Sequence, residues 1–222
     1  SVPTTLLSAQ TPLGLSEAIK VLAESHGHDL SLAESQQVDA LRTLPADVAT
    51  PLRDIVTNFL IMEDESAIMA HTASLAGDGS ASATQVFDLG LPNAGPIIQP
   101  VPLVQGSGGS WAPTPALSAA RIRMVDAATQ LKTALASHRA LSTSPAVDIE
   151  GLIAIGLDQV DSTYTQDYRL LIDAGGNDIY LNNAGGSGTG GLGLTDTYGA
   201  AALVDLAGND IYGAEPLDLH RS

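Results

Sequence analysis

The chain has 222 residues, and its 44% hydrophobic content is sufficient for the core of one large or two small domains. Its 25 acidic residues outnumber 9 basic ones, and the formal net charge of −16 disfavours binding to nucleic acid or to anionic membranes. The absence of cysteine excludes disulfides and thiol chemistry. The sequence contains no apolar run of about 18 residues, so no membrane span is predicted.

Two helices are predicted near the N-terminus. Residues 15–26 have apolar residues at helical spacing, with Ser16 as the expected N-cap and Gly27 as the stop. The sequence Ser31-Leu-Ala-Glu34 is a capping box, which predicts a second helix that ends at about Leu44, before a proline.

Two further helices begin with the same Thr-Pro pair. Thr50-Pro51 predicts an N-cap and a first-turn proline, and the helix is expected to run to about Ala70. Thr114-Pro115 predicts the start of the longest helix, which is expected to end near Ala140. The residues expected to face the core are Leu52, Ile55, Val56, Phe59, Leu60, Leu117, Met124, Ala128, Leu131 and Leu135.

The segment between these helices and the segment after them have a different character. Residues 76–113 are rich in Gly, Pro and Ser, so they cannot form a helix, and we expect a linker packed across the domain. Beyond residue 142 the apolar runs GLIAIGL, YRLLIDA and AAALVDL have strand length and are bounded by turn residues. The expected organisation is 1–75 helical, 76–113 linker, 114–141 a long helix completing the helical part, and 142–222 β repeats.

Nearly the same eight residues occur twice, as DAGGNDIY at 173–180 and DLAGNDIY at 205–212. Tyr180, Tyr198 and Tyr212 each follow an Asp-x pair, and Tyr164 follows Asp-Ser-Thr; the spacings of 16, 18 and 14 residues are close to one coil of a parallel β-solenoid. The sequence therefore predicts an α+β fold, in which an N-terminal helical bundle precedes a glycine-rich parallel β-solenoid-like segment. In such a stack, ladders of tyrosine and of Asp/Asn side chains would run from coil to coil.

The repeated acids make a calcium site a specific hypothesis. Carboxylates stacked about 4.8 Å apart repel one another unless a cation lies between them, and Ca²⁺ takes 6–8 oxygen ligands. The alternative is that these residues form Asx-Gly turns without any metal, because Asn and Asp tolerate left-handed backbone and bond locally. The candidate calcium ligands are Asp173, Asn177, Asp178, Asp205, Asn209 and Asp210.

The segments 176–180 and 208–212, both Gly-Asn-Asp-Ile-Tyr, resemble the second half of the glycine-rich nonapeptide of RTX (haemolysin-type) repeats. The resemblance covers about residues 150–213, although Asp173-Ala174 and Asp205-Leu206 stand where the family has two glycines. It implies a parallel β-roll in which Asp178 and Asp210 bind calcium, while Tyr180 and Tyr212 face the interior.

His26 and His28, two residues apart, are a second candidate metal site. The alternative is that they interact with the C-terminal end of the helix that stops at Gly27. No nucleophile with an adjacent base is recognisable, so we expect no catalytic residues of that kind.

Two functions remain open. The first is a secreted or cell-surface structural protein that assembles with copies of itself and has a calcium-stabilised solenoid. The second is a secreted hydrolase, whose catalytic residues would lie among the Asp, Glu and His residues of the helical part, with the repeats as a stability module. Glycosidase chemistry would need two carboxylates about 5–9.5 Å apart. Ser1 leads us to expect a processed chain, and only ten residues follow Tyr212. We therefore expect an open C-terminal coil, with either a longer native chain or head-to-tail self-association.

Overall fold

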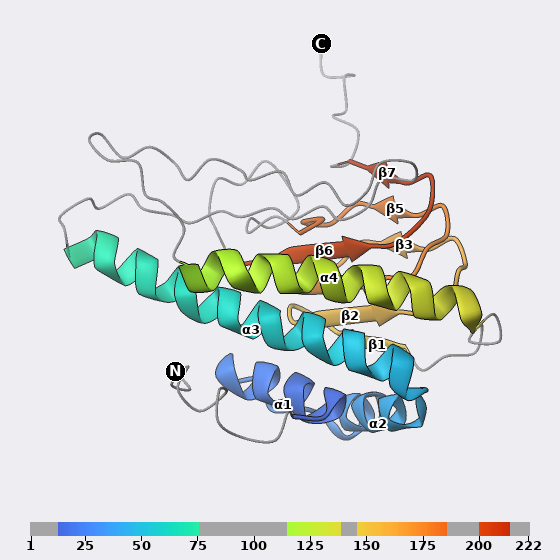
Figure 1. The fold of residues 1–222 in the computed structure, drawn as a ribbon, viewed down its shortest axis with the longest axis horizontal. Coiled ribbons are helices and arrows are strands. Elements are labelled where there is room, and N and C mark those ends of the chain that lie inside the picture. Colours follow the sequence, from blue (N-terminus) through green and yellow to red (C-terminus); the bar gives the residue numbers. More distant parts are fainter. Residues whose placement is uncertain (1–12, 76–114, 139–145, 186–199, 214–222) are drawn as a thin grey trace, which may run out of the picture.

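The computed structural model describes residues 13–75, 115–138, 146–185 and 200–213 (Figure 1). Within these ranges the protein is α+β, with four α-helices and two small parallel-stranded sheets, which confirms the predicted fold class at this level. The predicted linker at 76–113 lies outside the described residues. None of the described helices is both long and apolar enough to cross a membrane.

Helices α1 (Leu15–Ser25) and α2 (Leu32–Ala40) pack against each other at one side of the molecule. The predicted capping box is confirmed, since Ser31 and Glu34 exchange side-chain and backbone hydrogen bonds. The expectation that Ser16 caps α1 is wrong, because Gly14 is the N-cap and the buried Ser16 hydroxyl donates to the Val38 carbonyl at 2.9 Å. This bond ties α1 to α2.

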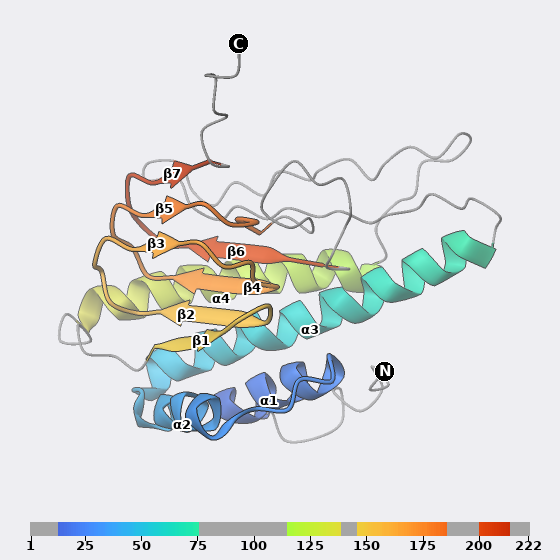
Figure 2. The same cartoon turned by 180° about the vertical axis from the view of Figure 1, so that it is seen from behind.

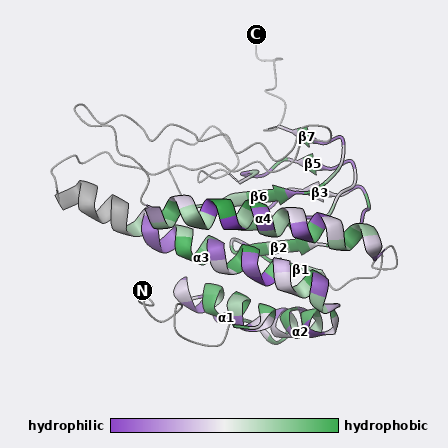
Figure 3. Ribbon diagram, in the orientation of Figure 1, coloured by the Kyte–Doolittle hydropathy of each residue, from purple (hydrophilic) through white to green (hydrophobic). Residues whose placement is uncertain are grey.

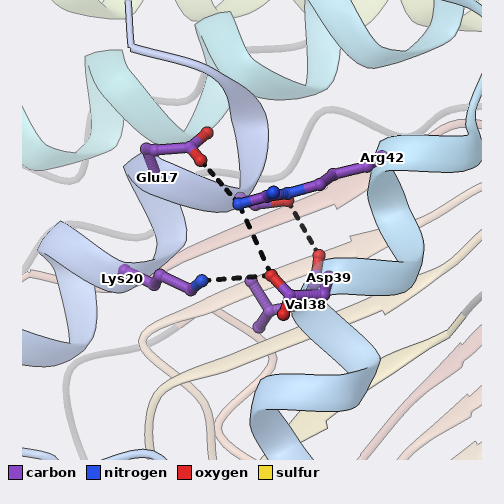
Figure 4. Close-up of polar contacts among 6 residues, drawn as sticks. Glu17, Lys20, Val38, Asp39 and Arg42 are labelled. Atoms are coloured by element: carbon purple, nitrogen blue, oxygen red, sulfur yellow. Dashed lines mark hydrogen bonds and ion pairs between the residues drawn. The ribbon is translucent and has the colours of Figure 1, made fainter.

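Ion pairs also connect α1 to α2 and to the short 3₁₀ helix η2 (Leu41–Thr43) that follows it. Lys20 binds Asp39 at 3.0 Å, and Arg42 binds Glu17 at 2.8 Å (Figure 4). These side chains are exposed, so the pairs contribute little stability, and the buried apolar residues of α1 hold it in place.

The two long helices, α3 (Ala46–Leu75) and α4 (Pro115–Ser137), lie side by side (Figure 1). The prediction that Thr50 caps α3 is wrong, because the helix begins one turn earlier and encloses Pro51. The N–H groups of Val48 and Ala49 donate to the Pro45 carbonyl, so the first turn forms before Pro51, whose ring removes one later bond. All ten apolar residues predicted to face the core are buried.

In the part of the chain that the structure describes, seven short strands form two sheets. The larger sheet has the order β1-β2-β4-β6 and the smaller β3-β5-β7, and every pairing is parallel except β1 with β2. The strands are β1 Val147–Ile149, β2 Ile153–Gly156, β3 Thr163–Tyr164, β4 Leu170–Asp173, β5 Ile179–Tyr180, β6 Ala202–Asp205 and β7 Ile211–Tyr212.

The chain thus passes three times from the larger sheet to the smaller one. We call each pass a rung: the first is β2 with β3, the second β4 with β5, and the third β6 with β7. The rungs stack directly on one another, with the second and third joined by the pairing of Asp173 with Asp205 and of Tyr180 with Tyr212. Figure 2 shows this stack from the side of the sheets.

The larger sheet is covered on both faces, by α3 and α4 on one side and by the smaller sheet on the other (Figures 1 and 2). Alternate residues therefore enter two different cores. Ile172 and Val204 join the helix-side cluster, whereas Leu171 and Leu203 pack with Tyr180 inside the rungs. Coverage of both faces explains why β4 and β6 are apolar up to their final aspartates, and Figure 3 shows β6 coloured as hydrophobic.

The N-terminal edge of the larger sheet is closed. Strand β1, which the sequence did not predict, pairs antiparallel with β2, and α2 packs against β1. The backbone N–H of Asp148 in β1 donates to Gln37 Oε1 of α2 at 2.9 Å. The Gln37 side chain thereby accepts a backbone N–H at the edge of the sheet, to which another strand could otherwise pair.

Candidate functional site: the tyrosine column and the turn ladder

A column of stacked tyrosines runs along the rungs, with Tyr180 buried in the interior and Tyr212 exposed at the third rung. The rings of Tyr164 and Tyr180 have centroids 5.2 Å apart and are 9° from parallel, and those of Tyr180 and Tyr212 are 4.9 Å apart and 5° from parallel. The predicted ladder is confirmed for these three residues. The prediction of a fourth rung at Tyr198 between them is wrong, because β5 pairs directly with β7; Tyr198 itself lies outside the described residues.

Two aspartates at the ends of β4 and β6 point into the same interior. Asp173 and Asp205 are 2% and 0% exposed. The Tyr164 hydroxyl donates to Asp173 Oδ2, and the Tyr212 hydroxyl donates to Asp205 Oδ2 at 2.7 Å. The other carboxylate oxygens accept backbone N–H groups, from Gly175 at 2.6 Å and from Ala207 at 3.2 Å.

The column contains three hydroxyls but two carboxyls. Gly156 occupies the register position of Asp173 in the first rung, so that rung supplies no carboxyl. Tyr164 therefore bonds to Asp173 of the rung above. The buried Tyr180 hydroxyl, which lies between, has no hydrogen-bond partner among the described residues.

Burial governs the proton affinity of these groups. Burial raises the pKa of Asp173 and that of Asp205 to about 7, although the hydrogen bonds from Tyr164 and Tyr212 act in the opposite direction. Burial and the charge of Asp173 also raise the pKa values of Tyr164 and Tyr180. The interior of the rungs thus favours neutral carboxyls and neutral tyrosines.

A second set of contacts, which we call the turn ladder, lies at the turn between the two sheets. In one half of it, a side chain accepts the backbone N–H of the matching residue one rung above. The N–H of Asn177 donates to Asp161 Oδ1 at 2.8 Å, and the N–H of Asn209 donates to Asn177 Oδ1 at 3.2 Å.

In the other half of the turn ladder the accepting side chain belongs to the rung above, and the donating backbone N–H belongs to the rung below. The N–H of Ser162 donates to Asp178 Oδ1 at 2.6 Å, and the N–H of Asp178 donates to Asp210 Oδ1 at 2.8 Å. An Asn-Asp pair therefore binds the rungs on both sides of it. This arrangement gives a physical reason for the repeated Asn-Asp sequence that does not require a metal.

The glycine before each Asn-Asp pair is required by the stacking. Gly176 and Gly208 have φ values of +146° and +149°, a region that side chains disfavour. A Cβ on Gly176 would lie 2.6 Å from the Val160 carbonyl oxygen of the rung below, and one on Gly208 would collide with the Gly176 carbonyl.

The sequence analysis missed a similar ladder at the next turn. The N–H of Asn183 donates to Asp167 Oδ1 at 2.7 Å, and Asn182 Nδ2 donates to the Gln166 carbonyl at 2.8 Å. These partners are 16 residues apart, the same interval that separates Tyr164 from Tyr180. Aligning the chain at that interval would have revealed them.

The six predicted calcium ligands form two neighbouring sets. Asp173 and Asp205 bond to tyrosines, while the other four belong to the turn ladder. The charge of Asp178 acts on Asp173 and that of Asp210 acts on Asp205, although no three acidic or histidine side chains among the described residues are arranged as a metal site. Among the buried side-chain oxygens of these six residues, as far as the structure describes them, Oδ2 of the fully buried Asp178 has no hydrogen-bond donor. Burial raises the pKa of Asp178, and the negative charges of Asp210, Asp161 and Asp158 raise it further.

The two histidines of the other candidate metal site bind separate acids. His26 Nε2 lies 2.9 Å from Glu63 Oε2, whereas His28 Nε2 lies 3.1 Å from Glu34 Oε1. Glu63 also accepts a hydrogen bond from Arg169 at 3.2 Å, so it connects α1 and α3 to the start of β4. The arrangement fits a structural contact between helices and rungs.

Comparisons of the chain with models of protein families, with curated proteins and with solved structures gave no match. We therefore base the functional proposal on the geometry of these residues.

Proposed function

We propose that this is a structural protein of the cell surface or of the secreted fraction. In this proposal the three rungs form a short β-solenoid supported by a helical layer, and the molecule assembles with copies of itself through its C-terminal rung. The observation that carries the proposal is the turn ladder, in which the Asn177-Asp178 pair binds the rung on either side of it. Asn209 presents this same chemistry on the last described rung.

The position of the acids favours this proposal over a hydrolase. Asp173 and Asp205 have the pKa values that suit a general acid near neutral pH, but they are 2% and 0% exposed and bonded to tyrosines. A general acid must reach the proton acceptor on its substrate directly or through one water molecule. Sealed carboxyls of this kind suit packing between rungs instead.

We further propose that calcium stabilises the turn ladder. Support comes from the unpartnered Asp178 Oδ2 and from the carboxylates of Asp210, Asp161 and Asp158, whose charges act on Asp178. Hard oxygen atoms of this kind are the ligands that Ca²⁺ prefers. Because the backbone N–H groups of the ladder are already satisfied by side chains, calcium would add stability without being needed for folding.

Thermal unfolding of the full chain with calcium and with EDTA tests this role. At free calcium 100-fold above the dissociation constant, the expected gain in the free energy of unfolding is about 2.7 kcal/mol. Asp178→Asn is the matched variant, because it keeps an oxygen for the Ser162 N–H but removes the charge. It should fold and lose the calcium response; identical melting curves of the wild-type chain in calcium and EDTA would contradict a calcium role.

Assembly is tested by sedimentation velocity over a range of protein concentrations. The proposal expects species larger than the 22.7 kDa chain whose population rises with concentration. A single species of monomer mass at all concentrations would refute the assembly role.

A further inference from the structure

The tyrosine column concentrates the side chains of this protein that lose one electron most easily. The chain contains no cysteine and one tryptophan, and three of its five tyrosines stack in the column. The ring centroids are 5.2 and 4.9 Å apart and the planes 9° and 5° from parallel, so neighbouring π systems are close enough for an electron to pass between them. Tyr180 in the middle is fully buried, whereas Tyr212 is 42% exposed.

Oxidation of a tyrosine also requires a base for its proton, because a phenol that has lost an electron is a strong acid. Tyr212 donates to Asp205 at 2.7 Å, a distance at which a side chain can accept the proton directly. Tyr164 donates to Asp173 in the same way. Burial raises the pKa values of both carboxyls to about 7, so above neutral pH they are carboxylates that bind a proton more tightly than an exposed aspartate does.

We propose that the tyrosine column carries an oxidising equivalent from Tyr212 to Tyr164 by way of Tyr180. A one-electron oxidant takes an electron from Tyr212, and the phenolic proton moves to the Asp205 carboxylate, which leaves a neutral tyrosyl radical. Tyr164 then gives an electron to that radical and its proton to Asp173. The proton on Asp205 returns to Tyr212. In the net reaction the oxidant gains one electron, and one proton passes from Tyr164 to Asp173.

The buried hydroxyl of Tyr180 has a role in this activity. Because it has no hydrogen-bond partner among the described residues, Tyr180 has no base for its proton, and the radical does not settle on it. Every adjacent pair of rings in the column includes Tyr180. Two neutral tyrosyl radicals therefore do not form on neighbouring rings, and the column transfers oxidising equivalents without forming dityrosine between its own rungs.

The charge of the protein indicates the class of oxidant. The formal net charge is −16, and the charge of Asp210 acts on Asp205, the base for Tyr212. A cationic one-electron oxidant is therefore attracted to the protein, and salt should slow the reaction by screening this attraction. Tris(bipyridine)ruthenium(III), generated by light, is a suitable probe. This activity goes beyond the proposed assembly function and does not depend on it.

The first measurement uses a full-length parent chain in which Trp111, Tyr168 and Tyr198 are replaced by phenylalanine, so that the column contains its only tyrosines. Tyr168 donates to an aspartate at an exposed position of β1, so water can replace its hydroxyl. Electron paramagnetic resonance after freeze-quenching gives the rate of radical formation at about pH 8, above the pKa of Asp205.

Asp205→Asn in the parent keeps an oxygen for the Tyr212 hydroxyl but is not a base, so radical formation should slow by about 100-fold. Asp167→Asn is the matched control, because it keeps the oxygen that accepts the Asn183 N–H at a turn outside the column, and the rate should be unchanged. Equal rates for Asp205→Asn and the parent would overturn the proposal.

The second measurement tests the transfer step in the otherwise wild-type chain. Tyr164→Phe should confine the radical to Tyr212, so peptide mapping after oxidation should find more dityrosine that joins residue 212 of two chains than in the wild type. Neither chain should contain dityrosine at residue 180. An unchanged yield of the link at residue 212, or dityrosine at residue 180 as a main product, would show that the column does not transfer the radical.

Discussion

In the tyrosine column, each hydroxyl has a different set of neighbours although the three rings are equivalent in register. Tyr164 and Tyr212 donate to aspartates, whereas the Tyr180 hydroxyl is buried without a partner among the described residues. A buried polar atom without a hydrogen bond costs free energy, while removing one member of a satisfied pair leaves the other unsatisfied. The same Tyr→Phe substitution should therefore change the free energy of unfolding differently at different positions of the column.

Tyr180→Phe should leave the free energy of unfolding unchanged or raise it, because the substitution removes an unsatisfied hydroxyl and keeps the stacked ring. Tyr164→Phe should lower it by about 1–3 kcal/mol, because Asp173 then loses a donor in the interior. Urea unfolding of both variants, which differ from the wild type by the same single oxygen atom, provides the measurement. A larger loss for Tyr180→Phe than for Tyr164→Phe would contradict this description of the column.

Among the elements, the strands of the larger sheet and the turn ladder stabilise the stack by different means. The strands contribute apolar burial on both faces, as with Leu171, which is 1% exposed. The ladder contributes hydrogen bonds to backbone N–H groups at the turn. Burial of a large side chain is worth more than one such bond, so the strand residues should dominate stability.

Leu171→Ala should lower the free energy of unfolding by about 2–5 kcal/mol through the cavity it leaves. Asp178→Ala should cost about 1–3 kcal/mol, because the Ser162 N–H loses its acceptor. Chemical denaturation in EDTA separates these effects from any effect of calcium. If Asp178→Ala proves as costly as Leu171→Ala, the turn has a larger role than its hydrogen bonds explain.

The elements that the sequence predicted well are those whose signals are local. The capping box at Ser31 and the Thr-Pro start of α4 depend on neighbours within four residues. The start of α3 was predicted too late because Pro51 was taken as a first-turn residue, whereas Pro45 accepts the first bonds. Strand β1 was missed because it is three residues long and depends on β2 and α2.

The candidate site shows the same division between local and distant signals. The repeated Gly-Asn-Asp-Ile-Tyr predicted that the tyrosines and turns would stack, which the three rungs bear out. The sequence did not reveal that Asp173 and Asp205 turn toward tyrosine hydroxyls. The partner of each aspartate depends on which tyrosine hydroxyl lies nearest in the folded chain. For Asp173 this is the hydroxyl of Tyr164, in the rung below.

For the whole molecule, the helical layer and the rungs form one body, because a single buried cluster contains residues of α1, α3 and α4 as well as of β2, β4 and β6. Glu63 of α3 adds a polar connection, with His26 at 2.9 Å and Arg169 at 3.2 Å. Shared burial of this kind predicts cooperative unfolding of helices and strands together.

Glu63→Ala should lower the free energy of unfolding by about 2–3 kcal/mol, between the values for exposed and for buried ion pairs, since the Glu63 side chain is 11% exposed. Glu63→Gln, which keeps the shape of the side chain, should cost less. Unfolding monitored at once by circular dichroism and by tyrosine fluorescence should give coincident transitions. Separate transitions for helices and tyrosines would show that the two parts do not share a core.

The stability of the whole molecule should depend on pH in a direction set by the buried carboxyls. Folded Asp173 and Asp205 hold their protons to about pH 7, whereas in the unfolded chain aspartates lose them near about pH 4. Between these values the folded state binds more protons, so the free energy of unfolding falls as pH rises. The raised pKa values of Tyr164 and Tyr180 predict a further fall above about pH 10.

Urea titrations in EDTA at several pH values measure this slope, and Asp205→Asn is the control. The variant keeps a side-chain oxygen for the Tyr212 hydroxyl but cannot ionise, so its slope between about pH 4 and pH 7 should be shallower than that of the wild type. Equal slopes would mean that charges elsewhere on this acidic protein determine its pH response.

The interval between rungs has a consequence for how this molecule tolerates change in its gene. Tyr164 and Tyr180 are 16 residues apart and Tyr180 and Tyr212 are 32 apart, yet both pairs stack in register. The connection between the second and third rungs is therefore twice as long as that between the first and second, and it returns the chain to the same register. Because the pairings of Asp173 with Asp205 and of Tyr180 with Tyr212 define that register, a change in the length of this connection that keeps these pairs in place should leave the described rungs stacked as they are.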